Sequence, residues 1–270
     1  MTKLSFVLCV ISCWYATAGH ACSVIYYVDS ATNKIYVANN EDYWYDTEPY
    51  IQVMPRSKHQ LARLWYGWDR FAQGGINEAG LFFDGAVTPE QKIPEGYASP
   101  RGNLGDEILA VCKTVEEAIA YLEEHRIALT NAHMIFGDSA GQAVVVEWVN
   151  GERRLVPMKS SALTMTNFLL SDTASTSSSC LRYHAMEAAL GKLNPESEAT
   201  LKDVGNVVGK AAQLPAQDET GRIGGTLYST FIDITDMKFV LVYKLDNARV
   251  TTLDLKSVFN KRGKKTIKLG

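Results

Sequence analysis

The chain has 270 residues, of which 46% are hydrophobic and 21% are charged. These proportions are typical of a globular protein with a sizeable core, and they exclude a disordered, collagen-like or coiled-coil chain. The formal net charge of −3 provides no basic surplus to neutralise phosphates, so we expect no binding of nucleic acid. A basic cluster near the C-terminus is expected to be a solvated tail.

Residues 1–21 have the features of a secretory signal peptide. Lys3 supplies the positive start, residues 4–15 form an apolar run too short to span a bilayer, and small residues follow. Gly19 and Ala21 occupy positions −3 and −1 of a cleavage site before Cys22. We therefore expect a secreted or periplasmic protein without a transmembrane segment, whose mature chain is one domain of residues 22–270.

Removal of the leader would make Cys22 the first residue and leave Cys112 and Cys180 as the other cysteines. Three cysteines can form at most one disulfide, which excludes a disulfide scaffold. Three interpretations of an N-terminal cysteine stay open: a coincidence of cleavage, a lipid anchor, or a catalytic group. In the last, the thiolate is the nucleophile and the α-amine, with an ordinary pKa of about 7.7–8.0, is its base.

The N-terminal part is expected to consist of strands and hairpins. Apolar, β-branched and aromatic residues predict strands at 23–29 and 35–38, joined by a polar turn. A hairpin brings its two open ends together, so residues 39–42, which close the second strand, would lie near Cys22. Asp42 would then lie close to the Cys22 amine. Further along, we expect a strand at 65–72, a turn at 74–80 and a buried strand at 81–87.

Helices and further hairpins follow. A helix is expected over 104–126, with a new start at Thr114, where Thr114 and Glu117 match a capping box, and with Cys112 on its buried face. The remaining expected elements are a hairpin of 133–137 and 142–148, strands at 155–157 and 162–166, a polar loop at 171–179, helices at 181–193 and 200–212, and a hairpin of 227–233 and 239–245. This order predicts an α+β domain of two antiparallel sheets with helices outside.

Five landmarks, in order, resemble the linear amide C–N hydrolases. This is the N-terminal-nucleophile (Ntn) group that holds choloylglycine (bile-salt) hydrolases and penicillin V acylases. The landmarks are Cys22-Ser23, the Asn-x-Asp-aromatic segment at 40–43, Gly75-Ile76-Asn77-Glu78-Ala79-Gly80-Leu81, Leu163-Thr164-Met165-Thr166-Asn167, and Arg182-Tyr183. The resemblance implies a four-layer αββα sandwich and a cofactor-free hydrolase. Its partner would be a small-molecule N-acyl amide, cleaved at a linear, non-peptide C–N bond through a thioester on Cys22.

The resemblance also implies a role for each matched residue. Cys22 would attack the amide carbonyl, and Asp42 would accept a hydrogen bond from the Cys22 amine and orient it. Asn167 would donate to the developing oxyanion. Arg182 would stabilise negative charge around the thiolate and Asp42. The second oxyanion donor falls near Val87, which offers only its backbone N–H.

The sequence departs from the family pattern in two places. Asn39 stands near the nucleophile where the family usually has arginine, and a neutral amide does not stabilise a thiolate as a guanidinium does. The resemblance therefore does not extend to bile-salt or penicillin V specificity. In those hydrolases a long hairpin that helps to assemble tetramers separates the positions of Asn167 and Arg182. That hairpin is missing here, so we expect a monomer or a small homo-oligomer.

No group of Cys, His and Asp has metal-ligand spacing, and no glycine-rich phosphate loop is present, so neither metal nor cofactor is expected. Aromatic residues at 43–45 and 65–68 are expected either to line an acyl pocket or to pack in the core. Two alternatives to the amidase stay open. One is an acyltransferase of the same fold, and the other is a secreted binding protein with a lipidated or inert Cys22.

Overall fold

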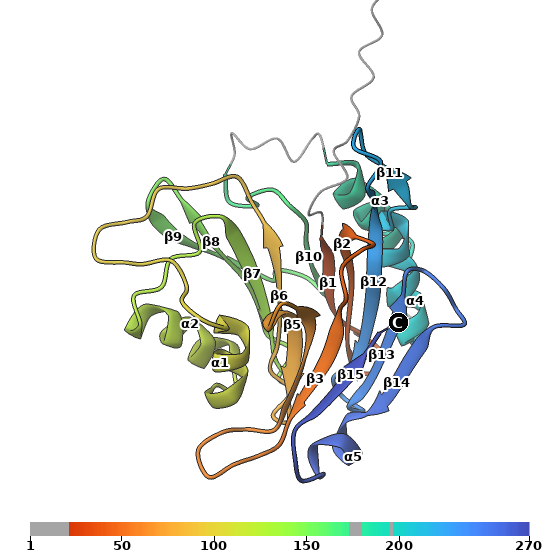
Figure 1. Ribbon diagram of the computed structural model, residues 1–270, viewed down its shortest axis with the longest axis horizontal. Coiled ribbons are helices and arrows are strands. Elements are labelled where there is room, and N and C mark those ends of the chain that lie inside the picture. The colour runs from red at the N-terminus through yellow and green to blue at the C-terminus, as the bar shows by residue number, and fades with distance from the viewer. Residues whose placement is uncertain (1–21, 173–179, 195–196, 270) are drawn as a thin grey trace, which may run out of the picture.

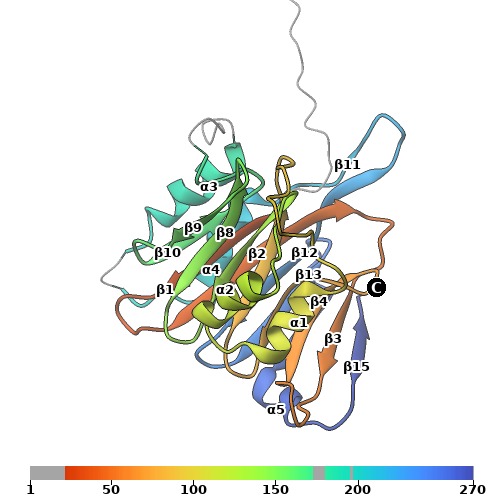
Figure 2. The same ribbon diagram turned by 90° about the vertical axis from the view of Figure 1, so that its left-hand side faces the viewer.

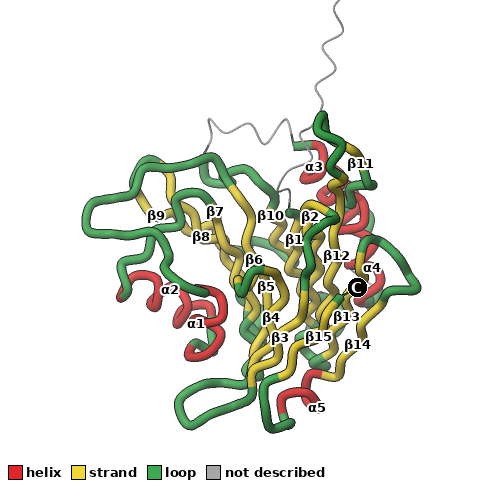
Figure 3. The backbone as a smooth tube through the Cα atoms, viewed as in Figure 1, coloured by secondary structure: helices red, strands yellow, loops and turns green. Residues whose placement is uncertain are grey.

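The computed structural model describes residues 22–172, 180–194 and 197–269, so the expected leader and most of the polar loop at 171–179 lie outside the described residues. Two antiparallel sheets face each other, and helices cover both outer sides (Figure 1). On one side lie α1 (Leu104–Val111) and α2 (Val115–Glu124), and on the other lie α3 (Leu181–Leu190) and α4 (Leu201–Val208). Figure 2 shows α1 and α2 in front of their sheet, and Figure 3 shows the helices confined to the periphery. The predicted α+β sandwich is confirmed.

The first sheet contains both strands of the predicted N-terminal hairpin. Its strands pair in the order β10-β1-β2-β12-β13-β14, and β11 pairs with β12. Their bounds are β1 (Ser23–Val28), β2 (Ile35–Trp44), β10 (Ala162–Met165), β11 (Ala216–Gln217), β12 (Ile223–Asp233), β13 (Lys238–Tyr243) and β14 (Val250–Asp254). A short helix, α5 (Leu255–Phe259), follows β14.

The second sheet pairs in the order β15-β3-β4-β5-β6-β7-β8-β9. Its bounds are β3 (Tyr50–Met54), β4 (Arg63–Trp68), β5 (Phe71–Asn77), β6 (Phe82–Val87), β7 (Ala132–Gly137), β8 (Ala143–Val149), β9 (Glu152–Pro157) and β15 (Lys265–Lys268). The basic side chains of this segment are exposed, as expected, but the segment is not a tail, because residues 265–268 form the edge strand β15. Gln52 on β3 donates to the Lys265 carbonyl and accepts from the Thr266 hydroxyl, which ties this segment to the sheet edge.

Apolar clusters fill the space between successive layers. Val24, Leu64 and Ile135 belong to the cluster between the sheets, because alternate residues of each strand point inward. Phe83 and Leu109 belong to the cluster between the second sheet and α1 and α2. The third cluster lies under α3 and α4. Cys112 is buried in the second cluster, as predicted, although it follows α1 as its C-cap residue instead of lying within a helix.

The strand β2 is longer than the sequence pattern predicts. Residues 39–42 were expected to close the strand, but they are buried inside it. The neighbouring strand β12 supplies hydrogen-bond partners for three of these polar side chains, so they can be buried within the ladder. The pairs are Asn39 with Thr230, Asn40 with Ser229 and Asp42 with Thr226.

The expected turn at 74–80 is also wrong in its first half, because Gly74 and Gly75 lie within β5. A Cβ at Gly74 would lie 2.3 Å from Asp84 Oδ2 and 2.4 Å from the Tyr66 hydroxyl oxygen. Glycine is therefore required there by close packing rather than by a turn. The turn itself contains Gly80, whose φ of +86° is left-handed.

The predicted interruption of the first long helix is confirmed. The Thr114 hydroxyl accepts from the Glu117 backbone N–H and caps α2. The Glu117 carboxylate reaches the Lys113 N–H instead of the Thr114 N–H, so the capping box is only half formed. Among the described residues, no helix has the length and apolar character needed to cross a membrane.

Candidate active site

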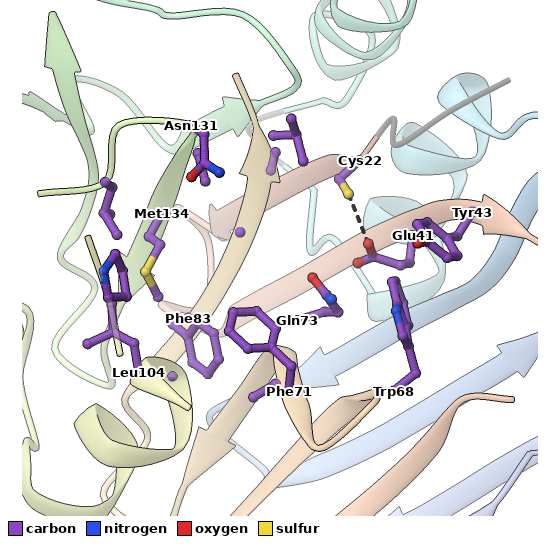
Figure 4. A pocket seen from close by; sticks show the side chains of 18 residues that line it. Cys22, Glu41, Tyr43, Trp68, Phe71, Gln73, Phe83, Leu104, Asn131 and Met134 are labelled. Carbon is purple, nitrogen blue, oxygen red and sulfur yellow. Dashed lines mark hydrogen bonds between the residues drawn. The ribbon is translucent and has the colours of Figure 1, made fainter. Parts of the chain in front are cut away.

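Cys22 immediately precedes β1 at the open end of the first hairpin, and it is 4% exposed. The hairpin register pairs Ser23 with Asn40, so Glu41 is opposite Cys22 on β2. The Cys22 thiol donates a hydrogen bond to Glu41 Oε1 over a sulfur–oxygen distance of 3.0 Å (Figure 4). The carboxyl that contacts the thiol is therefore Glu41, which the sequence analysis did not select.

Arg182, in the first turn of α3, connects the predicted site residues. Its Nη1 donates to the Cys22 carbonyl oxygen at 2.8 Å and to the Ser23 hydroxyl at 2.9 Å. Its Nη2 donates to Asn167 Oδ1 at 3.0 Å, and Nη1 lies 3.8 Å from Asp42 Oδ2. These contacts fix the backbone around Cys22 and bring Asn167 and Asp42 to it. A planar guanidinium suits this arrangement because it presents several donors in a fixed geometry.

Asp42 is buried and held by neutral donors. Thr226 Oγ1 donates to its Oδ1 at 2.6 Å, and Gln213 Nε2 donates to its Oδ2 at 2.8 Å. Burial raises the pKa of Asp42 to about 7, although these hydrogen bonds and the nearby Arg182 act in the opposite direction. Its charge is therefore sensitive to pH around neutrality.

Asn167 and Val87, the two residues expected to face the oxyanion, lie together. Asn167 Nδ2 donates to the Val87 carbonyl oxygen at 2.9 Å. The neighbouring Thr88 N–H bonds to the Asn131 carbonyl, so alternation along an antiparallel pair directs the Val87 N–H away from β7. That places the Val87 N–H on the same side of β6 as its carbonyl and Asn167. The Val87 side chain is 47% exposed and contributes no donor.

Asn39 does not replace the family arginine at the thiol. Its Nδ2 donates to Asp84 Oδ2 at 2.9 Å, and its Oδ1 accepts from the backbone and side chain of Thr230. The Tyr66 hydroxyl donates to the same Asp84 oxygen at 2.8 Å. Burial raises the pKa of Asp84 to about 8. Asn39 thus belongs to a buried polar cluster beside the nucleophile, and Asp84 is a second acid that the sequence analysis missed.

The segment that carries Asn167 is held by a buried pair behind it. His133 Nδ1 lies 2.8 Å from Glu147 Oε1, and His133 Nε2 lies 2.6 Å from the Thr166 carbonyl oxygen. Glu147 also accepts from the backbone N–H groups of Leu170 and Ser171. These bonds anchor the chain on both sides of Asn167.

A pocket of about 310 Å³ opens beside the nucleophile, with Cys22 and Glu41 in its wall. Its other lining is mainly apolar, and Figure 4 shows Phe83, Leu104 and Met134 at the end away from Cys22. Of the aromatic residues noted in the sequence, Tyr43 and Trp68 line this pocket. Within the described ranges, no three His, Cys, Asp or Glu side chains gather in a way that would hold a metal ion.

Comparisons with known proteins report on the family and the fold of the chain. The family model described as acyl-coenzyme A:6-aminopenicillanic acid acyl-transferase matches residues 29–247. No curated protein matches the sequence. Three similar solved structures are a variant of the conjugated bile acid hydrolase from Clostridium perfringens, the penicillin V acylase from Agrobacterium tumefaciens and the Caenorhabditis elegans ortholog of N-acylethanolamine-hydrolyzing acid amidase.

The bile acid hydrolase has a TM-score of 0.71 and 15% identity, over 92% of this chain and 97% of that chain. The penicillin V acylase has a TM-score of 0.66 and 18% identity, over 92% and 91%. The amidase ortholog has a TM-score of 0.54 and 14% identity, over 79% and 93%. At these identities the likeness establishes the Ntn-hydrolase sandwich. By its sequence, the chain belongs to the acyl-coenzyme A:6-aminopenicillanic acid acyl-transferase family.

Proposed function

We propose that residues 1–21 are removed on export and that Cys22, then N-terminal, cleaves a linear N-acyl amide through a thioester. The observation that carries this proposal is the set of contacts made by Arg182. It joins the Cys22 backbone to Asn167 and lies beside Asp42, so residues from distant parts of the chain converge on one cysteine next to a pocket. Family membership and the shared fold support the same reaction class.

In the proposed mechanism, the Cys22 α-amine takes the thiol proton and the thiolate attacks the amide carbonyl carbon. The carbonyl oxygen becomes an oxyanion that accepts hydrogen bonds from Asn167 Nδ2 and the Val87 N–H. The C–N bond then breaks, and the α-ammonium gives its proton to the leaving amine. Water attacks the thioester with the α-amine as base, which releases a carboxylic acid and restores the thiol. Asp42 accepts a hydrogen bond from the amine and orients it.

The pocket provides a site for the acyl group. Its wall carries the nucleophile, and most of its lining is apolar, so burial of an apolar acyl chain there is favourable. Arg182 and Asp42 do not line this pocket. We therefore place the acyl part of the substrate in the pocket and the leaving amine on the Arg182 side of Cys22.

Intact mass spectrometry of the exported protein, followed by a panel of N-acyl amides, tests the proposal. The expected results are a mass that begins at Cys22, release of amine and acid from an apolar N-acyl amide, and loss of release in Cys22→Ala. Cys180→Ser is the matched control and should keep the activity. A mass that begins elsewhere, or a lipid on Cys22, would contradict the mechanism and favour a binding protein.

The same thioester could pass its acyl group to an amine instead of water. The description of the matched family favours this second candidate. Adding an acceptor amine to the assay separates the two reactions. Transfer predicts an acceptor-dependent N-acyl product, whereas hydrolysis predicts free acid at a rate that does not depend on the acceptor.

A further inference from the structure

The contact between Cys22 and Glu41 limits which protonation states the site can adopt. In the resting state the thiol donates to Glu41 Oε1 across 3.0 Å. Attack requires a thiolate, which has no proton to donate. A thiolate and a carboxylate at this distance would be two acceptors facing each other with like charges. The contact persists during catalysis only if the Glu41 carboxyl supplies the proton of the hydrogen bond.

The surroundings of Glu41 favour its neutral form. The titratable groups that face it are Cys22 from the start of β1, Asp42 from its own strand, Asp84 from β6, Tyr66 from β4 and Tyr228 from β12. None of these side chains is a cation, and the proposed processing adds one further titratable group, the Cys22 α-amine, which the mechanism pairs with Asp42. Arg182, the cation beside Cys22, makes its hydrogen bonds to the Cys22 carbonyl, Ser23 and Asn167.

The hydrogen-bond environment of Glu41 also favours its neutral form. Glu41 is 3% exposed, and its Oε2 has no hydrogen-bond partner among the described residues. A buried carboxylate without donors is costly, whereas a buried carboxylic acid is much less so. Burial, followed by the nearby Asp84, raises the pKa of Glu41 well above its ordinary value. The hydrogen bond from the Cys22 thiol to Oε1 favours the carboxylate, but burial, the unpartnered Oε2 and the neighbouring carboxyls act in the opposite direction and select the protonated acid.

We infer that Glu41 acts as a neutral carboxylic acid that donates a hydrogen bond to the Cys22 thiolate and so stabilises the nucleophile. This role rests on the proposed function of Cys22. The thiol proton still passes to the α-amine, and Glu41 keeps its own proton throughout the cycle. Glu41 thus supplies stabilisation at a site where Asn39 is turned toward Asp84 and where, among the described residues, no guanidinium forms a hydrogen bond with the sulfur. Ionisation of Glu41 at alkaline pH would remove the donor and place a negative charge beside the thiol.

Alkylation of Cys22 by iodoacetamide, followed against pH by peptide mass spectrometry, tests this inference without a substrate. The full purified protein is compared with Glu41→Gln, which keeps an N–H donor that cannot ionise, and with Glu41→Met, which has a similar size and no donor. Glu152→Gln, at an exposed glutamate of β9, is the matched control. Melting temperatures of all the proteins report whether each variant folds.

We expect the wild-type rate to pass through a maximum and fall as Glu41 ionises. Glu41→Gln should keep the rate at pH 6 and lose the alkaline fall, whereas Glu41→Met should alkylate about tenfold more slowly at pH 6. If Glu41→Gln is as slow as Glu41→Met, a carboxylate is needed and the inference is wrong. It is also wrong if Glu41→Met reacts like the wild type.

The combined outcomes of the alkylation and amide-cleavage assays keep the conclusions on Glu41 and on the proposed function separate. If Glu41→Met does not fold, the presence or absence of the alkaline fall in Glu41→Gln decides the question alone. A protein that follows these profiles but cleaves no amide would contradict the proposed function and leave the role of Glu41 supported. A protein that cleaves amides, but whose alkylation profiles are unchanged in both variants, would support the proposed function and contradict the role of Glu41.

Discussion

Replacement of Glu147 by glutamine should destabilise the fold through the segment that carries Asn167. The wild-type carboxylate faces donors at both oxygens. Oε1 accepts from the Leu170 N–H and faces His133 Nδ1, and Oε2 accepts from the N–H and hydroxyl of Ser171. The other His133 nitrogen faces the Thr166 carbonyl, which is an acceptor. Because both ring nitrogens face acceptors, we expect the imidazole to carry two protons and to form an ion pair with Glu147.

The geometry sets the size of the effect. Glu147→Gln turns one acceptor oxygen into an NH₂ group that faces N–H or O–H donors, whichever way the amide is oriented. It also leaves the His133 cation buried without its anion, since both side chains are fully buried. Removing one partner of a buried pair costs about 3–5 kcal/mol. We expect a loss in this range in the free energy of unfolding.

Urea unfolding at pH 7, followed by circular dichroism, measures this loss, with exposed Glu152→Gln as the control that should match the wild type. A free energy within about 1 kcal/mol of wild type would refute the ion pair. The pH dependence provides a second check. Hydrogen bonds from His133 and Ser171 lower the pKa of Glu147 despite burial, so its stabilisation is present above the ordinary glutamate pKa and is lost as pH falls. The Glu147→Gln variant should not show this loss of stability as the pH falls.

Other substitutions test neighbouring features. Asn167→Ala should lower kcat about 10²–10³-fold if Asn167 is an oxyanion donor, and steady-state kinetics would count against that role if only KM changed. Burial raises the folded pKa of Asp42 to about 7, so its contribution to stability is greatest below about pH 4 and declines by up to ~4 kcal/mol as pH rises to 7. Urea unfolding across this range should show a smaller decline for Asp42→Asn, and an equal decline would mean that Asp42 titrates normally. Gly74→Ala would place Cβ 2.3 Å from Asp84 Oδ2 and should cost about 1–3 kcal/mol in a thermal melt, whereas Gly209→Ala, with open space around it, should not.

Local sequence patterns predict most of the fold but not the length of β2. Alternating apolar residues mark the first hairpin, and an N-cap marks the start of α2. Residues 39–42 are polar, so the local hydrophobic pattern predicts that the strand ends before them. Their partners, at 226–230 on β12, are nearly 190 residues away in sequence, and only the folded sheet brings the two polar stripes together. Burial of a polar strand is decided by such distant partners.

The same limit applies to the candidate site. The sequence resemblance selects Cys22, Asp42, Asn167 and Arg182, and the structure brings these four together around Arg182. Glu41 was missed because the resemblance treats it as the variable residue between Asn40 and Asp42. Hairpin register provides the missing signal, since pairing of Ser23 with Asn40 implies that residue 41 is opposite residue 22.

The position of Arg182 explains how two neighbouring carboxyls can have different charges in the proposed reaction. Asp42 has Arg182 at 3.8 Å and two hydrogen-bond donors, and its pKa is about 7. Glu41 has no such cation, and its pKa lies well above its ordinary value. An α-ammonium at Cys22 would lower the pKa of Asp42 further, because an opposite charge favours the carboxylate. The cation and the two donors at Asp42, set against the unpartnered Oε2 of Glu41, favour ionisation of Asp42 over Glu41, so that the site holds an anion to orient the amine and a neutral acid to stabilise the thiolate.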